Sequence, residues 1–194
     1  MNKLYLAIFF VCASVYNLNA QAATSPVVVD SNSKLIEFLS AATYNVKKID
    51  STNFVILVGN VKIRQGKTLL YGDSIILNTT SNILEGFGNI HINDADSVHT
   101  YAEYMKYLGN NKKAYLRRKV KLTDGLGVLT TDSLDYDVSI KLGQYNKGGK
   151  LVRNKTILKS IEGFYYGITR DVIFRKKVEL TDPESTILTD TLEY

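Results

Sequence analysis

Tyrosines recur along this chain at a fixed interval, and this interval constrains the fold more than any single residue does. Tyr107, Tyr136, Tyr165 and Tyr194 stand 29 residues apart. A second set of positions keeps this step to within one residue, with one interval doubled: Val61, Ile90, Val120 and Val178. Self-similarity at a fixed period is typical of repeat architectures, so the sequence predicts an array of one small unit.

Turn-forming residues fall in two interleaved series, so the chain is predicted to reverse direction about every fourteen or fifteen residues. One series lies near 65–66, 93–94, 123–125, 154–155 and 182–183, and the other near 79–81, 109–111, 137–139 and 167–169. Between reversals, apolar and polar residues alternate with the period of a half-buried strand, as in residues 55–64. Each unit is therefore predicted to be a long antiparallel hairpin, and the stacked hairpins to share one sheet.

Glycines inside the predicted strands indicate where these strands bend. Gly59, Gly72, Gly86 and Gly88 occupy strand positions, where a missing side chain usually marks a kink or a bulge. If every strand folds over at the same height, two half-sheets face each other and enclose the apolar side. The predicted fold is therefore all-β, an elongated and open-ended β-jelly roll or trough.

The first residues have the features of an export signal. Lys3 precedes an uncharged apolar run at 4–15, which is too short to span a bilayer, and small residues follow. We expect a signal peptide at 1–22, cleaved after Ala20 or Ala22, with uncleaved anchoring as the alternative. A flexible segment at 23–33 and a repeat domain at 34–194, whose first partial strand covers 34–44, would follow. The only cysteine, Cys12, lies in the leader, so the exported protein, expected in the periplasm, would hold no disulfide.

The charge balance argues against a nucleic-acid partner. Without Lys3 the chain keeps 23 of its 24 basic residues and all 19 acidic ones, a net charge of +4, which is no strong basic footprint. Two cations are placed unusually, because Arg118 and Lys176 share the strand face of Val120 and Val178. A cation on the enclosed face belongs at a rim, so both are predicted to meet an anionic head group.

Residues for catalysis or metal binding are scarce. His91 and His99 are the only histidines, and no nucleophile-elbow, phosphate-loop or zinc-protease motif occurs. His91, Asp94, Asp96 and His99 are interpreted as residues of a solvated turn rather than metal ligands. The acids Asp73, Glu103, Asp132 and Asp190 recur once per unit, so we interpret them as acceptors for amides at the bend and not as catalytic pairs. The sequence predicts no enzyme, no metal and no cofactor.

The apolar side of the strands is the candidate ligand site. Residues of one parity would line a continuous trough, and a self-filled core without a ligand is the alternative. The predicted lipid-binding residues are Val61, Ile63, Ile90, Ile92, Leu116, Val120, Leu122, Leu134, Phe174, Val178 and Leu180.

Several of these segments resemble a known family. Residues 58–66, with the sequence VGNVKIRQG, are followed by LLYGDS at 69–74, and together they closely resemble the signature of the OstA-like family. Residues 129–136, 145–149 and 158–165 look like the LptA-type, repeat-array branch of that family. The resemblance covers about 34–194.

The resemblance implies a periplasmic protein of lipopolysaccharide transport. Its β-jelly-roll trough would shield acyl chains, because each methylene left in water costs about 0.8 kcal/mol. Its partners would be lipopolysaccharide or a related anionic glycolipid, and other OstA-like domains, including copies of itself, joined head to tail by strand addition. The alternative is a structural β-repeat, a spacer or adhesin-like module without a lipid ligand.

Overall fold

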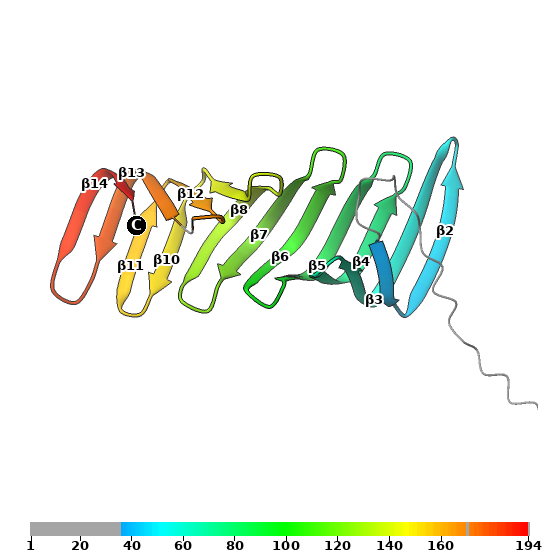
Figure 1. The fold of residues 1–194 in the computed structure, drawn as a ribbon, viewed down its shortest axis with the longest axis horizontal. Coiled ribbons are helices and arrows are strands. Elements are labelled where there is room, and N and C mark those ends of the chain that lie inside the picture. The colour runs from blue at the N-terminus through cyan, green and yellow to red at the C-terminus, as the bar shows by residue number, and fades with distance from the viewer. Residues whose placement is uncertain (1–35, 170, 194) are drawn as a thin grey trace, which may run out of the picture.

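The computed structural model describes residues 36–169 and 171–193, which form an elongated stack of strands (Figure 1). These residues contain 14 strands in one antiparallel sheet and no helix, hence no helix long and apolar enough to cross a membrane. β2 lies at one end of the long axis and β14 at the other. The predicted all-β stack of hairpins is confirmed, whereas the signal peptide and the flexible segment predicted at 1–33 lie outside the described residues.

The hairpin pattern is regular except in the fourth unit. The strands are β1 (Ile36–Ser40), β2 (Thr43–Ile49), β3 (Thr52–Gln65), β4 (Thr68–Asn78), β5 (Ile83–Asp94), β6 (Val98–Leu108), β7 (Lys113–Thr123), β8 (Val128–Asp137), β9 (Leu142–Tyr145), β10 (Gly149–Arg153), β11 (Thr156–Ser160), β12 (Glu162–Tyr166), β13 (Asp171–Thr181) and β14 (Thr186–Glu193). From β3 to β8 each strand pairs with the next one along the chain, as the two turn series predict.

The long strands fold over at a repeated bulge, which we call the crease. In β3, Val58 pairs with Ser74 and Val61 with Gly72, so that two residues of β3 face only Asp73 of β4. The same two-against-one pairing recurs in β5, β7 and β13. Both crease residues have positive φ angles in every case: Gly59-Asn60, Gly88-Asn89, Arg118-Lys119 and Lys176-Lys177. Consecutive left-handed residues break the straight path of a strand, so each long strand divides into two halves.

The crease also explains the recurring acids, because Asp73, Glu103, Asp132 and Asp190 are the single residues that face these pairs. The observed partners of Asp73 and Glu103 are side chains and not the predicted backbone amides. The Asn89 side-chain amide donates to Asp73 Oδ2 at 2.9 Å, and Lys119 Nζ lies 2.6 Å from Glu103 Oε1. Asp73 of β4 therefore links the crease of β3 to the crease of β5, and Glu103 of β6 links the crease of β5 to the crease of β7.

Two half-sheets result from the crease. The first half-sheet contains β2, β9, β12 and the N-terminal halves of β3, β5, β7 and β13, and the second contains β1, β10, β11 and the C-terminal halves of the same four strands. The predicted first strand at 34–44 needs correction, because the chain breaks after Ser40 and forms two edge strands. The amide of Ala42 donates to the Gly59 carbonyl at 2.9 Å, which places the break beside the first crease.

The fourth unit replaces long strands by separate short ones. Three residues, Asn146 to Gly148, occupy the crease between β9 and β10, and Gly148 has a φ of 95°. β10 and β11 continue the second half-sheet, while β9 and β12 continue the first. The sequence of this unit departs from the repeat, yet its four strands keep the stack continuous from β8 to β13.

Candidate functional site

A groove with a volume of about 560 Å³ lies between the two half-sheets. Its floor is apolar because the inward-facing residues of β3 to β8 meet there. The hairpin ends of both half-sheets line its mouth. The lining residues are Ile63, Gln65, Thr68, Leu70, Leu84, Ile92, Asp94, Asp96, Ser97, Val98, Thr100, Met105, Tyr107, Ala114, Leu116, Leu122, Asp124, Leu134, Tyr136, Val138, Lys141, Tyr165 and Gly167.

The predicted lipid-binding residues fall into three groups. Five of them line the groove: Ile63, Ile92, Leu116, Leu122 and Leu134. Three lie beside the crease and are only 1–2% exposed: Val61, Ile90 and Val120. The last three belong to a separate buried cluster farther along the stack: Phe174, Val178 and Leu180. All eleven residues thus lie on the inner face, as the alternation predicted. Only five of them line the groove.

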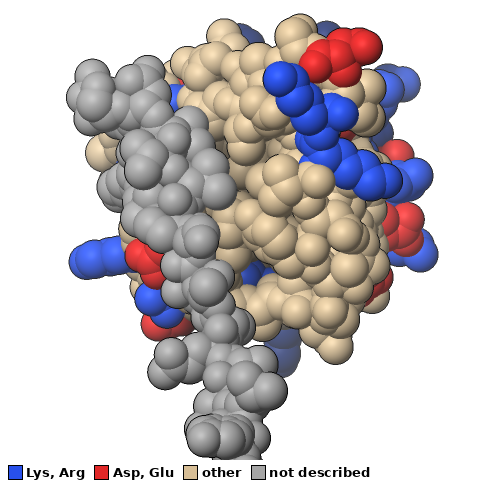
Figure 2. Space-filling model, turned by 90° about the vertical axis from the view of Figure 1, so that its right-hand side faces the viewer, with Lys and Arg blue, Asp and Glu red and all other residues tan. Residues whose placement is uncertain are grey.

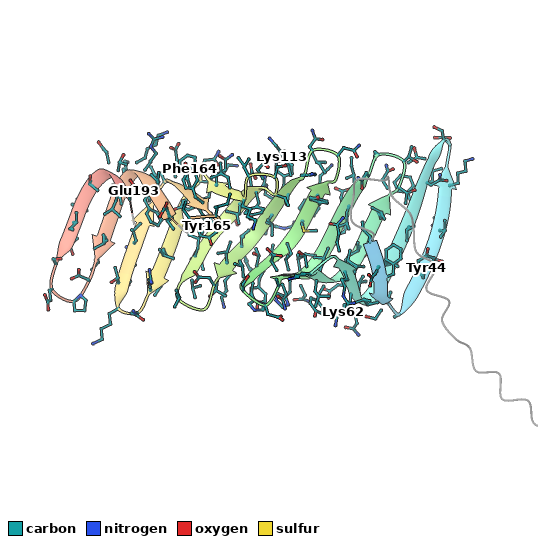
Figure 3. All side chains as sticks on the ribbon, viewed as in Figure 1. Tyr44, Lys62, Lys113, Phe164, Tyr165 and Glu193 are labelled. Atoms are coloured by element: carbon teal, nitrogen blue, oxygen red, sulfur yellow. The ribbon has the colours of Figure 1, made fainter. Side chains whose placement is uncertain are left out.

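Three of the repeated tyrosines line the groove, a role that the predicted lining residues did not include. Tyr107 of β6, Tyr136 of β8 and Tyr165 of β12 lie on every second strand of the first half-sheet, and Figure 3 marks the position of Tyr165. Burial raises the pKa of Tyr107, and the pKa of Tyr136 is raised by burial and then by the charge of Asp94. Their hydroxyls therefore stay neutral near pH 7. The interval of 29 residues was the signal that could have identified them.

The mouth of the groove carries both signs of charge. Asp94, Asp96 and Asp124 come from hairpin ends of the second half-sheet, and Lys141 comes from the opposite rim. The turns themselves use these acids, since Asp94 accepts a hydrogen bond from the Thr68 hydroxyl at 2.8 Å and Asp124 accepts one from the amide of Leu126. Lysine and neutral tyrosine hydroxyls are the groups here that can donate to a polar ligand oxygen.

Arg118 and Lys176 do not lie at the position predicted for them. Both have a φ of 64° and occupy the crease, on the side of the stack away from the mouth, and neither lines the groove. Their side chains, about 60% exposed, form ion pairs with Glu103 and Glu162. The buried residues keep one parity across the crease, as Leu116 and Val120 show, and parity fails only at the two left-handed residues, whose side chains are exposed. A head-group contact at these cations therefore stays a prediction for the outer crease.

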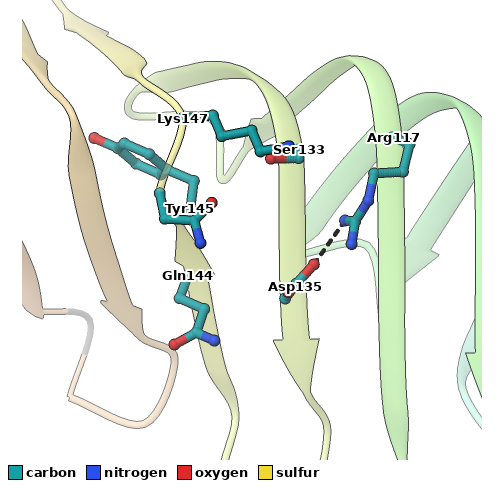
Figure 4. Close-up of a pocket in the computed structure, with 7 residues that line it drawn as sticks. Arg117, Ser133, Asp135, Gln144, Tyr145 and Lys147 are labelled. Atoms are coloured by element: carbon teal, nitrogen blue, oxygen red, sulfur yellow. Dashed lines mark ion pairs between the residues drawn. The ribbon is translucent and has the colours of Figure 1, made fainter.

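A second, smaller pocket of about 170 Å³ lies between β7, β8 and β9 (Figure 4). Of the two cations that line it, Arg117 and Lys147, the first already has partners, because Arg117 Nη1 lies 2.6 Å from Asp135 Oδ1 and donates to the carbonyls of Leu116 and Leu134. Figure 4 shows the ring of Tyr145 directed away from this ion pair. Ligand sites are mostly apolar and larger than this small polar pocket, so the groove is the candidate site.

The histidines lie on the outer face of the sheet. His91 Nε2 is 3.0 Å from His99 Nδ1, and the His91 ring stacks between Tyr71 and Tyr101. Among residues 36–169 and 171–193, no group of three or more histidine, cysteine, aspartate or glutamate residues is placed to hold a metal ion.

Comparisons with known proteins assign this chain to a family. A family model described as OstA-like protein matches residues 33–190. Among solved structures, the chain is similar to LptH, the LptA-homologous periplasmic component of the lipopolysaccharide transport device from Pseudomonas aeruginosa. That match has 17% identity and a TM-score of 0.46, and it covers 53% of this chain and 75% of LptH. Comparison with curated proteins gives no match. Because the family match spans nearly all of the repeat region, this protein belongs to the OstA-like family of non-catalytic lipopolysaccharide-transport components.

Proposed function

We propose that this chain is a periplasmic carrier or bridge that binds lipopolysaccharide or a related anionic glycolipid. One observation carries the proposal: a groove with an apolar floor opens between two half-sheets in a chain of this family. Its volume, about 560 Å³, falls in the range of small-molecule sites. Burial of an acyl chain there would be favourable by about 0.8 kcal/mol for each methylene.

The ends of the stack support association with similar domains. Among residues 36–169 and 171–193, β2 pairs only with β3, and β14 only with β13, so each has one edge free for strand addition within this part of the chain. Val46 of β2 pairs with the buried Val55, yet it is 63% exposed because no described strand covers the inner face of β2. Figure 2 shows that this end is largely uncharged at its centre, with charged side chains gathered at the periphery. Such an end suits the addition of another OstA-like domain.

Photo-crosslinking in cells of the native host tests the lipid ligand. A photoreactive residue at Ile92 of β5 or Leu122 of β7 would face the groove, whereas one at Lys62 of β3 or Lys121 of β7 would lie on the outer face of the sheet. We expect lipopolysaccharide or a related glycolipid to crosslink at the two groove positions and not at the two outer controls. Recovery of the adducts from the periplasmic fraction would test the compartment.

The alternative function, a structural spacer without a ligand, predicts a different pattern. The groove positions would then capture no lipid, and crosslinks at Lys62 and Lys121 would go to proteins or be absent. That result, obtained with folded variants, would contradict the proposed function.

A further inference from the structure

The apolar interior of the stack is divided into two parts. The first cluster extends from β1 to β8 and includes the floor of the groove. The second cluster consists of Leu129, Tyr145, Leu158, Phe174, Val178 and Leu180. None of these six residues lines the groove, and Phe174 has no exposed surface. The groove is thus confined to one part of the stack, although the half-sheets continue to β14.

Tyr145 stands at the boundary between the two parts. It lies on β9, next to β8, and is 4% exposed. Its hydroxyl oxygen is 2.6 Å from Ser160 Oγ, and Ser160 in turn donates to the Glu162 carbonyl at 2.7 Å. Because serine has one hydroxyl hydrogen, the Tyr145 hydroxyl is the donor in their bond. The ring is therefore fixed at its far end by a buried hydrogen bond.

Two glycines leave the space that this ring fills. A Cβ atom at Gly149 of β10 would lie 2.5 Å from Cζ of Tyr145, and one at Gly163 of β12 would lie 2.3 Å from its Cε1. These strands belong to different half-sheets, so the ring spans the interior from one to the other. Gly143, two residues before Tyr145, faces Tyr136 and Tyr165 of the groove, whose atoms would lie 3.4–3.8 Å from a Cβ there.

We propose that Tyr145 is an internal wall that ends the groove and limits the length of the acyl chain bound there, an inference that rests on the proposed function. Neither glycine leaves a gap beside the ring, so the ring fills the interior between β10 and β12. Leu122, which lines the groove, packs against both clusters and marks the point where the groove meets the second one. Acyl chains would occupy the side of β3 to β8, while the second cluster serves only as core. This chain would then hold its ligand in a pocket with a closed end and not in a channel along its whole length.

A chain-length series tests this wall. Saturated fatty acids of increasing length would compete with a fluorescent fatty acid for the wild-type protein, Tyr145→Ala and Tyr145→Phe. In the wild type we expect affinity to rise about fourfold for each methylene, the factor for full burial, and then to level off. Tyr145→Ala should level off at a longer chain, and Tyr145→Phe, which keeps the ring, should match the wild type.

Each outcome decides one of the two proposals. If the wild type binds no fatty acid of any length, the proposed function fails, and the wall fails with it. If it binds but its affinity keeps rising, or if Tyr145→Ala levels off at the wild-type length, only the wall is overturned. Should Tyr145→Ala not fold, photoreactive residues at Leu122 and Leu192 in the presence of Tyr145 decide: lipid captured at Leu122 alone supports the wall, and capture at Leu192 overturns it.

Discussion

At the scale of single residues, the crease is where residue type and backbone conformation fit each other least. Gly59 and Gly88 adopt left-handed angles at little cost, whereas Arg118 and Lys176 adopt them with φ angles of 64°. A left-handed conformation costs a residue with a Cβ about 1–2 kcal/mol. The later units therefore hold a strained backbone where the earlier ones use glycine, and ion pairs on the exposed surface offset little of this strain.

Replacing Arg118 with glycine should stabilise the protein. We expect the free energy of unfolding to increase by about 0.5–1 kcal/mol, because the relief of left-handed strain exceeds the added entropy of glycine in the unfolded chain. Glu103 would keep its ion pair with Lys119. Urea unfolding measures the change. The matched control is Lys121→Gly on the same strand, which should destabilise; a loss of stability in both variants would show that the crease carries no strain.

At the scale of elements, a row of stacked rings crosses the outer face of the second half-sheet. Tyr71, His91 and Tyr101 pair across β4, β5 and β6, with ring centroids 5.2 and 4.5 Å apart. Lys62 lies over the Tyr71 ring at one end of the row, and Lys121 lies over the Tyr101 ring at the other. His91 is the member of this row that titrates near neutral pH, and the row has a lysine at each end.

The stacked histidine should make stability depend on pH. Burial lowers the pKa of His91 from 6.5, and the neighbouring His99 lowers it further. Below about pH 6.5 the unfolded chain then binds more protons at this position than the folded one, so stability falls as the pH drops from 7 through the folded pKa. His91→Phe keeps a ring between Tyr71 and Tyr101 and removes the titration.

Urea unfolding at several pH values between 5 and 7 checks this expectation. The loss of unfolding free energy on acidification should be smaller in His91→Phe than in the wild type. His99 remains in the variant but loses its contact with His91, so the difference reports the titration of His91 together with its coupling to His99. Parallel pH profiles for the two proteins would contradict the effect.

The hairpins were predictable from sequence because their causes are local. Turn residues recur in two series, and the glycines at the first creases mark the bends, so the two facing half-sheets follow from short-range patterns. The crease at Arg118 was not predictable from residue type, since arginine has no preference for a left-handed angle. Its phase in the repeat, matching Gly59 and Gly88, was the available signal.

The wall in the fourth unit depends on contacts between segments that the repeat pattern does not relate. Tyr145 meets Gly149 and Gly163 only because three crease residues separate β9 from β10, and the repeat gave no equivalent for them. For the same reason the sequence predicted one continuous lining of eleven residues, whereas the structure divides it between a groove, a crease and a closed core. Parity identifies the inner face, but it does not identify which part of that face is filled.

At the scale of the whole molecule, the apolar interior reaches the surface at both ends of the stack. Ile187 of β14 pairs with Leu180 of the second cluster and is 47% exposed, because no described strand pairs with the other edge of β14. Leu188, the next residue, pairs with Glu179 and lies on the outer face. A domain added by strand pairing would cover the inner face of β14 and leave its outer face in water.

These two neighbours therefore form a matched pair for testing the joint. Ile187→Lys places a charge on the surface that an added domain would bury, whereas Leu188→Lys adds the same charge on the outer face of the same strand. We expect this chain to self-associate with rising concentration and Ile187→Lys to weaken the association on the order of tenfold, about 1.4 kcal/mol, more than Leu188→Lys. Sedimentation velocity over a range of concentrations measures both. Equal association of the two variants would mean that the joint does not use the inner face of β14. That face would then be an apolar surface left in water and not a contact surface.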